Sequence, residues 1–266
     1  VGVGGIMLPN HSPLVIAEQF GTLDALFPGR IDLGLGRAPG TDQLTLRALR
    51  RHPGSADSFP QDVLELQALL GPVQPGQRIQ AVPGANSQVP LWILGSSTFG
   101  AAMAGEFGLP YAFASHFAPD YLYTALETYR SRFKPSIQKD TPYCMMGINI
   151  IAAPSDKEAE FLASTQRMSI TDLLRGNRGL SKPPIADMDT YWSVDERVQA
   201  QRMMAMSVVG SPDTIRSKLE GILAQTRVNE LMIVSDVYDH ELRLRSYEYI
   251  AQVMQALNSE KAADEI

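Results

Sequence analysis

Hydrophobic residues along the chain follow a strand period and a helix period in turn. In residues 30–36, Ile31, Leu33 and Leu35 occupy every second position before a loop rich in Gly and Pro, which is typical of a strand. Residues 13–27 instead carry hydrophobic side chains at helical spacing and begin with a proline that follows a serine. A strand, a helix and a second strand thus follow one another within about forty residues, the rhythm of a βαβ unit.

The same alternation continues to the end of the chain. Solid apolar runs such as 91–94 are typical of parallel strands buried on both faces. We predict strands at 1–8, 30–36, 91–94, 111–115, 143–152 and 231–234, with a short extended piece at 207–210. We predict helices at 13–27, 57–70, 97–107, 120–133, 155–174, 213–225 and 240–257, and a frayed tail after residue 258.

Six barrel-type strands, each followed by a helix, indicate either a (β/α)₈ barrel or a doubly wound parallel sheet. Eight barrel units take about 250 residues, or roughly thirty each. The loops are long here, so the residues run out before eight strands appear. We therefore expect two further units, on the order of sixty residues, before Val1, either as a missing N-terminal part or on another polypeptide.

Composition narrows the class of protein. The 266 residues are 44% hydrophobic, and 23 basic and 29 acidic side chains leave a net charge of −6. The sequence shows no basic block, apolar run of transmembrane length or signal-peptide pattern, which disfavours nucleic acid and membranes as partners. Cys144 is the single cysteine, which excludes an internal disulfide and fits a reducing cytoplasm, and the four scattered histidines form no metal-ligand cluster.

The loop after the strand at 30–36 carries a residue suited to phosphate. Arg37 lies where this strand ends, and its guanidinium is a planar, permanently charged fork. Neighbouring glycines would let a ligand approach the backbone closely. The alternative is a surface arginine paired with Asp32 or Asp42.

A second loop has a similar character. Ser96 and Ser97 follow the strand at 91–94 and open a helix whose first acidic residue is Glu106, so the helix N-terminus favours an anion. A serine that only caps its own helix is the alternative. Neither loop has the G-x-S-x-G spacing of a serine hydrolase or the G-x-G-x-x-G spacing of a dinucleotide site. We predict that the two loops jointly hold a phosphate group.

Three long stretches carry a family resemblance. They read GGIMLPNHSPLVIAEQFGTLDALFPGRIDLGLGRAPGTD, LGSSTFGAAMAGEFGLPYAFASHFAP and VVGSPDTIR. With them the chain resembles, over essentially its whole length, the bacterial-luciferase-like flavin monooxygenases. The resemblance implies a TIM barrel that uses reduced FMN or the deazaflavin F420. Members of that family begin with two earlier βα units bearing a Glu-His-His stretch near the substrate, and this sequence lacks that stretch.

The resemblance also implies a set of flavin contacts. The pair Gly4-Gly5 matches a bulge with a non-prolyl cis peptide beneath the flavin ring, whereas without the resemblance it reads as a plain strand glycine or bulge. The residues implied to contact the cofactor are Gly4, Gly5, Arg37, Ala38, Pro39, Ser96, Ser97 and Gly100.

Further candidates lie at the carboxyl ends of predicted strands, where barrel enzymes place their sites. His116 follows the strand at 111–115 and could line the pocket or donate a proton, or it could be a loop histidine bonded to backbone. Asn149 lies in an apolar strand, and Asn10 and His11 follow the first strand, so all three are candidate pocket residues.

Residues 176–196 form a long predicted loop. It contains Pro183, Pro184 and the large aromatic Trp192, which we include among the pocket residues. A loop of about twenty residues in a compact domain is usually a lid or is disordered. Its position matches the mobile loop of the luciferase-like family, so we predict a mobile lid.

These observations favour one function and leave two open. The favoured one is a two-component monooxygenase in which a separate flavin reductase supplies reduced FMN, and O₂ oxygenates a small organic substrate. The alternatives are an F420-dependent oxidoreductase, which moves a hydride without oxygen, and a non-catalytic flavin-binding protein. Family members are often homodimers, and the helix at 13–27 is the apolar candidate for that interface.

Overall fold

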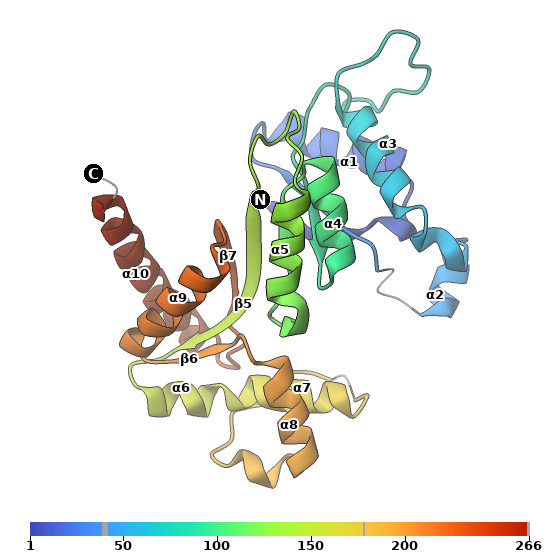
Figure 1. Cartoon of the computed structure of the whole chain (residues 1–266). Coiled ribbons are helices and arrows are strands. Elements are labelled where there is room, and N and C mark those ends of the chain that lie inside the picture. The colour runs from blue at the N-terminus through green and yellow to red at the C-terminus, as the bar shows by residue number, and fades with distance from the viewer. Residues whose placement is uncertain (39–41, 178, 265–266) are drawn as a thin grey trace. The chain divides into compact units, whose positions relative to one another are not determined.

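The computed structural model divides the chain into two compact units, which are described here one by one (Figure 1). The first unit comprises Val1–Phe113 and Tyr123–Cys144, and the second comprises Ala114–Leu122 and Met145–Ile266. The structure describes three ranges of residues, 1–38, 42–177 and 179–264.

The first unit is built on a parallel sheet. Its strands are β1 (Gly2–Met7), β2 (Asp32–Gly36), β3 (Leu91–Gly95) and β4 (Tyr111–Phe113), hydrogen-bonded in that order. Both neighbours of β2 are strands, and three of its five residues are buried, as the apolar sequence of a parallel strand requires. Because all four strands run in one direction, their carboxyl ends lie at the same edge of the sheet.

Helices follow the strands of the first unit. They are α1 (Pro13–Leu26), α2 (Gln43–Ala48), α3 (Phe59–Leu70), α4 (Thr98–Phe107) and α5 (Leu122–Arg132), with short 3₁₀ turns at Leu8–Asn10 and Pro53–Ala56. Helix α1 packs against α3, and α4 packs against β3 and β4. Exposed apolar side chains remain on α1, among them Val15 and Leu26, and the homodimer through this helix stays a prediction.

The second unit has three strands, also parallel. The long strand β5 (Cys144–Ala152) pairs through its first half with β7 (Glu230–Val234) and through its last residues with β6 (Val208–Gly210). Its helices and 3₁₀ turns are α6 (Asp156–Leu162), α7 (Ser164–Leu174), α8 (Val194–Met203), α9 (Pro212–Thr226), α10 (His240–Asp264), Pro119–Tyr121 and Met188–Thr190. Helices α6 and α9 pack against β6, and a buried apolar cluster lies beneath α6.

The α/β class with parallel strands followed by helices is confirmed, and three details were predicted wrongly. The extended piece at 207–210 is strand β6, so the described residues hold seven strands rather than six. The terminal helix continues to Asp264 instead of fraying after residue 258. The helix predicted at 155–174 is broken at Ala163, because the Ser164 hydroxyl donates to the Phe161 carbonyl at 2.6 Å and competes with the helical hydrogen bonds.

Residues 176–196 contain more regular structure than a plain loop. A 3₁₀ turn forms at Met188–Thr190, and α8 begins at Val194, inside the predicted loop. Ser193 and Glu196 form a reciprocal capping box that fixes this helix start. The mobility of the segment stays a prediction.

No helix in the described part of the chain has both the length and the hydrophobicity that spanning a membrane requires.

Candidate functional site

The carboxyl ends of β2 and β3 bring the two predicted phosphate loops together in the first unit. Gly36, the last residue of β2, is paired in register with Leu94 of β3. Arg37 therefore begins its loop beside the point at which Ser96 leaves the neighbouring strand. The two loops therefore start side by side, and their joint binding of a phosphate stays a prediction.

The Arg37 side chain lies against the start of α4. Its Cζ is 4.2 Å from the centroid of the Phe99 ring, in the first turn of that helix. Its Nε donates a hydrogen bond to the Ala56 carbonyl at 3.3 Å, and Nη2 lies 3.7 Å from Oδ1 of Asp57. At 3.7 Å the ion pair is longer than a hydrogen bond, and 43% of the Arg37 side chain remains exposed. The acidic neighbour is thus Asp57, and not Asp32 or Asp42 as the alternative had it.

The start of α4 is fixed by a hydrogen bond to a backbone carbonyl and not by the hydroxyl of Ser97. Ser97 is the N-cap residue in extended conformation, and its side chain makes no capping hydrogen bond. Its carbonyl instead accepts a hydrogen bond from the Tyr111 hydroxyl at 3.1 Å. Burial raises the pKa of Tyr111, so this donor keeps its proton at every physiological pH. The alternative that Ser97 serves only as a side-chain cap is wrong, and its hydroxyl remains available to a ligand.

Gly4 and Gly5 form an irregular point in β1. The peptide bond between them is cis, and the register with β2 shifts between Val3 and Ile6. A Cβ on Gly5 would lie 2.7 Å from the Gly34 carbonyl oxygen and closer still to the Leu94 side chain, so the packing excludes any side chain there. A Cβ on Gly4 would meet nothing within 4 Å. The bulge with cis geometry is therefore present, and its contact with a flavin stays a prediction.

The other candidates of the first unit have less definite surroundings. Asn10 ends a 3₁₀ turn directly after β1 and is half-buried, and His11 is exposed, with its N–H donating to the Leu8 carbonyl at 2.9 Å. Gly100 is buried in α4, where a Cβ would make only ordinary contacts. The remaining cofactor candidates are half-buried Ser96, exposed Ala38 and Pro39, which lies outside the described residues.

His116 and Asn149 meet in the second unit. Nδ2 of Asn149 donates to the His116 carbonyl at 2.5 Å, and the Ser115 hydroxyl donates to the Gly147 carbonyl, also at 2.5 Å. Asn149 is 6% exposed, and its amide holds the backbone of residue 116 beside the middle of β5. The two candidates thus contact each other through the His116 backbone, and their place in a pocket stays a prediction.

The His116 ring is enclosed on one side. It packs edge-on against Phe117, with ring centroids 4.7 Å apart, and a Cβ on Gly147 would lie 2.5 Å from its Nδ1. Nδ1 is buried, and among the described residues no group forms a hydrogen bond with it. Burial lowers the pKa of His116, and the nearby Gly147 backbone opposes only part of that shift. The imidazole is consequently neutral at pH 7.

Trp192 lies where the predicted lid joins α8. Its Nε1 donates to Oδ1 of Asp189 at 3.1 Å. The base of the lid is held by ion pairs: Arg175 binds Glu196 through two nitrogens, at 2.6 and 2.9 Å. The Arg175 guanidinium and the Ser193 backbone together lower the pKa of Glu196 to about 2. Lys182 and the Tyr191 hydroxyl both bind the Asp172 carboxylate at 2.6 Å.

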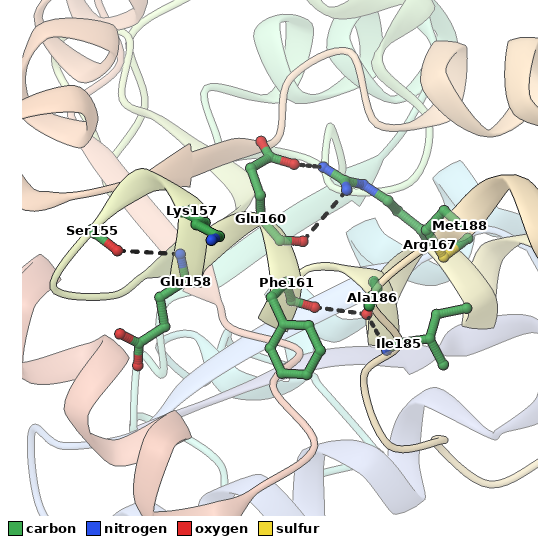
Figure 2. A pocket seen from close by; sticks show the side chains of 10 residues that line it. Ser155, Lys157, Glu158, Glu160, Phe161, Arg167, Ile185, Ala186 and Met188 are labelled. Atoms are coloured by element: carbon green, nitrogen blue, oxygen red, sulfur yellow. Dashed lines mark hydrogen bonds and ion pairs between the residues drawn. The ribbon is translucent and has the colours of Figure 1, made fainter.

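The second unit also has a pocket of about 550 Å³ on α6, α7 and the middle of the predicted lid (Figure 2). Glu160 and Arg167 form an ion pair on its wall (Figure 2). The lining residues are Ser155, Lys157, Glu158, Glu160, Phe161, Ser164, Arg167, Ile185, Ala186 and Met188. None of them is a predicted site residue.

Three residues that contact Arg37 or have a shifted pKa were not predicted from the sequence. Phe99 and Asp57 contact Arg37, and Asp236 follows the last residues of β7. Burial raises the pKa of the Asp236 carboxyl, and Arg243 opposes part of the shift. Asp236 could have been found by the rule that drew attention to Arg37, because it too follows an apolar strand. Asp57 has no such signal in the sequence.

Comparison with known proteins gives one consistent result. The model of the luciferase-like monooxygenase family matches residues 1–230. A luciferase-like monooxygenase of Escherichia coli K12 is 50% identical over 258 residues, which cover 97% of this chain and 77% of that protein. The Bacillus subtilis protein YvbT is 50% identical over 254 residues, or 95% of this chain and 76% of its own length.

Solved structures agree with the sequence comparison. The crystal structure of apo-MsnO8 superposes with a TM-score of 0.87 at 34% identity, covering 96% of this chain and 77% of that one. A 3,6-diketocamphane monooxygenase in complex with FMN has a TM-score of 0.65 at 16% identity, covering 94% and 76%. An F420-dependent secondary alcohol dehydrogenase has a TM-score of 0.62 at 17% identity, covering 91% and 75%. The last two likenesses, both under 25% identity, show the shared fold alone.

Proposed function

This chain belongs to the luciferase-like monooxygenase family, and we propose that it is the oxygenating component of a two-component, flavin-dependent monooxygenase. Its cofactor is reduced FMN, which a separate flavin reductase supplies. Its second substrate is O₂, and its product is an oxygenated small organic molecule.

The arrangement of Arg37 and the start of α4 is the observation that supports this proposal most. A guanidinium, an uncommitted Ser97 hydroxyl and the N-terminus of a ten-residue helix lie at the carboxyl ends of adjacent parallel strands. Each of the three favours an anion with several acceptor oxygens, such as the phosphate of FMN. The first turn of α4 carries no acidic residue to oppose it.

The open side of Gly4 fits the ring of the same cofactor. Gly5 is closed in by its neighbours, whereas the side of β1 at Gly4 has room for a flat group. A ring at this place and a phosphate beside Arg37 would both lie at the first unit's strands. The residues present therefore suit FMN at both of its ends.

The chain's own contributions are binding, orientation and proton exchange. Bound flavin supplies the redox chemistry with O₂. Arg37 and the α4 N-terminus bind the phosphate and so fix the position of the ring. In the second unit, burial favours the uncharged imidazole of His116, which can accept a proton. The predicted lid at 176–196, with Trp192, excludes water when it closes.

Rapid mixing tests the proposal. The protein is first equilibrated with photoreduced FMN without oxygen and then mixed with oxygenated buffer, while oxygen consumption and flavin absorbance are recorded. We expect oxygen to be consumed before the spectrum of oxidised FMN returns, since the bound flavin is protected from water. Reoxidation at the rate of free FMN would contradict the proposal.

An F420-dependent oxidoreductase is the second candidate. The fold likeness to an F420-dependent dehydrogenase supports it, and a phosphodiester would suit the same positive site. Equilibrium titration with FMN and with F420 separates the candidates, because a monooxygenase should prefer FMN. Tight FMN binding that leaves its reaction with oxygen unchanged would instead indicate a flavin carrier.

A further inference from the structure

Phe99 is a large aromatic residue on the surface of the first unit. It lies in the first turn of α4, and 41% of it is exposed. Burial in the core therefore does not account for an aromatic ring here. Its distinguishing contact is with Arg37, whose Cζ lies over the face of the ring, 4.2 Å from the ring centroid.

The Phe99 ring and the Ala56 carbonyl constrain Arg37 from two directions. The ring covers one face of the guanidinium, and the carbonyl receives its Nε hydrogen at 3.3 Å. An unrestrained arginine has many side-chain conformations and loses that freedom when it binds an anion. Two contacts made before binding reduce this loss.

Asp57 makes a competing contact. Its carboxylate lies 3.7 Å from Nη2, and its side chain is 82% exposed. Without the ring, the guanidinium would be free to turn toward this carboxylate and form the shorter, two-pronged pair that arginine prefers. The Phe99 ring, being part of α4, instead keeps the guanidinium at the helix N-terminus.

We infer that Phe99 is a positioning residue for the cofactor phosphate: it holds the Arg37 guanidinium over its ring in the first turn of α4 and keeps the pair with Asp57 long. This inference rests on the proposed flavin-phosphate site. The ring acts through Arg37 and makes no bond to the phosphate itself. Its effect must therefore be selective for ligands that carry a phosphate and must disappear when Arg37 is absent.

The test compares FMN with riboflavin, which lacks the phosphate. Dissociation constants are measured by flavin fluorescence for the wild type, Phe99→Leu, Phe99→Tyr, Arg37→Ala and the double variant. Leucine keeps the apolar bulk without a π-face, and tyrosine keeps the face. An exposed cation–π contact corresponds to about a two- to fivefold change in affinity. Circular dichroism and thermal melting verify that each variant is folded.

We expect Phe99→Leu to weaken FMN binding about two- to fivefold and to leave riboflavin binding unchanged. Phe99→Tyr should bind FMN as the wild type does. In the Arg37→Ala background, Phe99→Leu should have no further effect on FMN, since no guanidinium remains to be held.

Two results would overturn the inference alone. Equal weakening of FMN and riboflavin would mean that the Phe99 ring contacts the flavin ring, and unchanged FMN binding would mean that it holds nothing. A wild type that binds FMN no better than riboflavin would refute the proposed phosphate site, and the role of Phe99 with it. Because that last result is seen in the wild type, the two failures are distinguishable.

Discussion

Replacing Arg37 by alanine tests the phosphate site directly. The substitution removes a charge-assisted hydrogen bond, which contributes about 1.5–3 kcal/mol when it is well formed. Arg37 is 43% exposed, and water and salt screen an exposed charge, so the lower end of that range applies. We therefore expect the affinity for FMN to fall by about tenfold. Residual binding should remain, because the N-terminus of α4 contributes about 0.3–1 kcal/mol by itself.

A substitution at the neighbouring carboxylate should change the affinity for FMN in the opposite direction. Asp57 lies 3.7 Å from Nη2 of Arg37, where it neutralises part of the positive charge and repels a phosphate. Asp57→Asn should accordingly tighten FMN binding, by no more than about fivefold for an exposed pair. Arg78→Ala serves as the control for a change in net charge, since Arg78 is an exposed arginine in the loop between α3 and β3.

Fluorescence titration of each variant with FMN and riboflavin, at low and at physiological salt, decides the matter. If Arg37 binds the phosphate, Arg37→Ala should lower the affinity for FMN alone, and this loss of affinity should shrink as salt is added. If Arg37→Ala lowered the affinities for FMN and riboflavin equally, or lowered neither, the guanidinium would not be a phosphate ligand. A comparable loss in Arg78→Ala would show that only net charge matters.

Three further predictions concern stability. Gly5→Ala puts a methyl group 2.7 Å from a neighbouring carbonyl oxygen and should cost about 1–3 kcal/mol in urea unfolding, whereas Gly4→Ala, which faces open space, should unfold as the wild type does. The pKa of His116 is lowered in the folded state, so the unfolded state binds more protons below about pH 6.5. Stability should therefore fall as the pH drops from about 8 to 5, and less steeply in His116→Gln; equal slopes would contradict the burial argument. Glu196→Ala removes an ion pair and half of a capping box, so trypsin should cut residues 176–193 faster, with Asp195→Ala as the control; equal cleavage rates would mean that Glu196 does not hold the lid base.

The position of Arg37 was predictable because it depends on a local pattern. A strand of alternating hydrophobic residues ends at Gly36, and parallel strands place their carboxyl ends at one edge. The identity of its acidic neighbour was not predictable. Asp57 is twenty positions further along the chain, and only the folding of the intervening α2 and the 3₁₀ turn at Pro53–Ala56 carries it to the guanidinium.

The errors in the predicted helices have two different origins. The break at Ala163 follows from the Ser164 hydroxyl, which bonds both the Phe161 carbonyl and the Ile185 N–H at 2.8 Å. The second of these partners is distant in sequence, so the break could not be read from local spacing. The start of α8 could have been, because Ser193 and Glu196 have the spacing of a capping box.

Asn149 illustrates a limit of a different kind. An amide in an apolar strand must find hydrogen-bond partners when it is buried, since an unpaired polar group costs about 1–3 kcal/mol. The sequence cannot tell whether the partner is a ligand or the protein's own backbone. Here the partner is the His116 carbonyl, so the amide fixes the loop that carries the imidazole. Its influence on a bound substrate would thus be exerted through His116.

Strand packing alone requires some of the glycines of β1 and β2, and those glycines do not support the predicted flavin-ring site. Gly34 lies against the Val3 carbonyl, and Gly5 lies against the Gly34 carbonyl, so each strand excludes a side chain from the other. These two glycines are explained by the strand contact alone and are no evidence for a ligand. Gly4 differs, because no atom within 4 Å of its Cβ position demands a glycine. The ring site therefore depends on Gly4 rather than on the pair, and substitution there should affect flavin binding without affecting the fold.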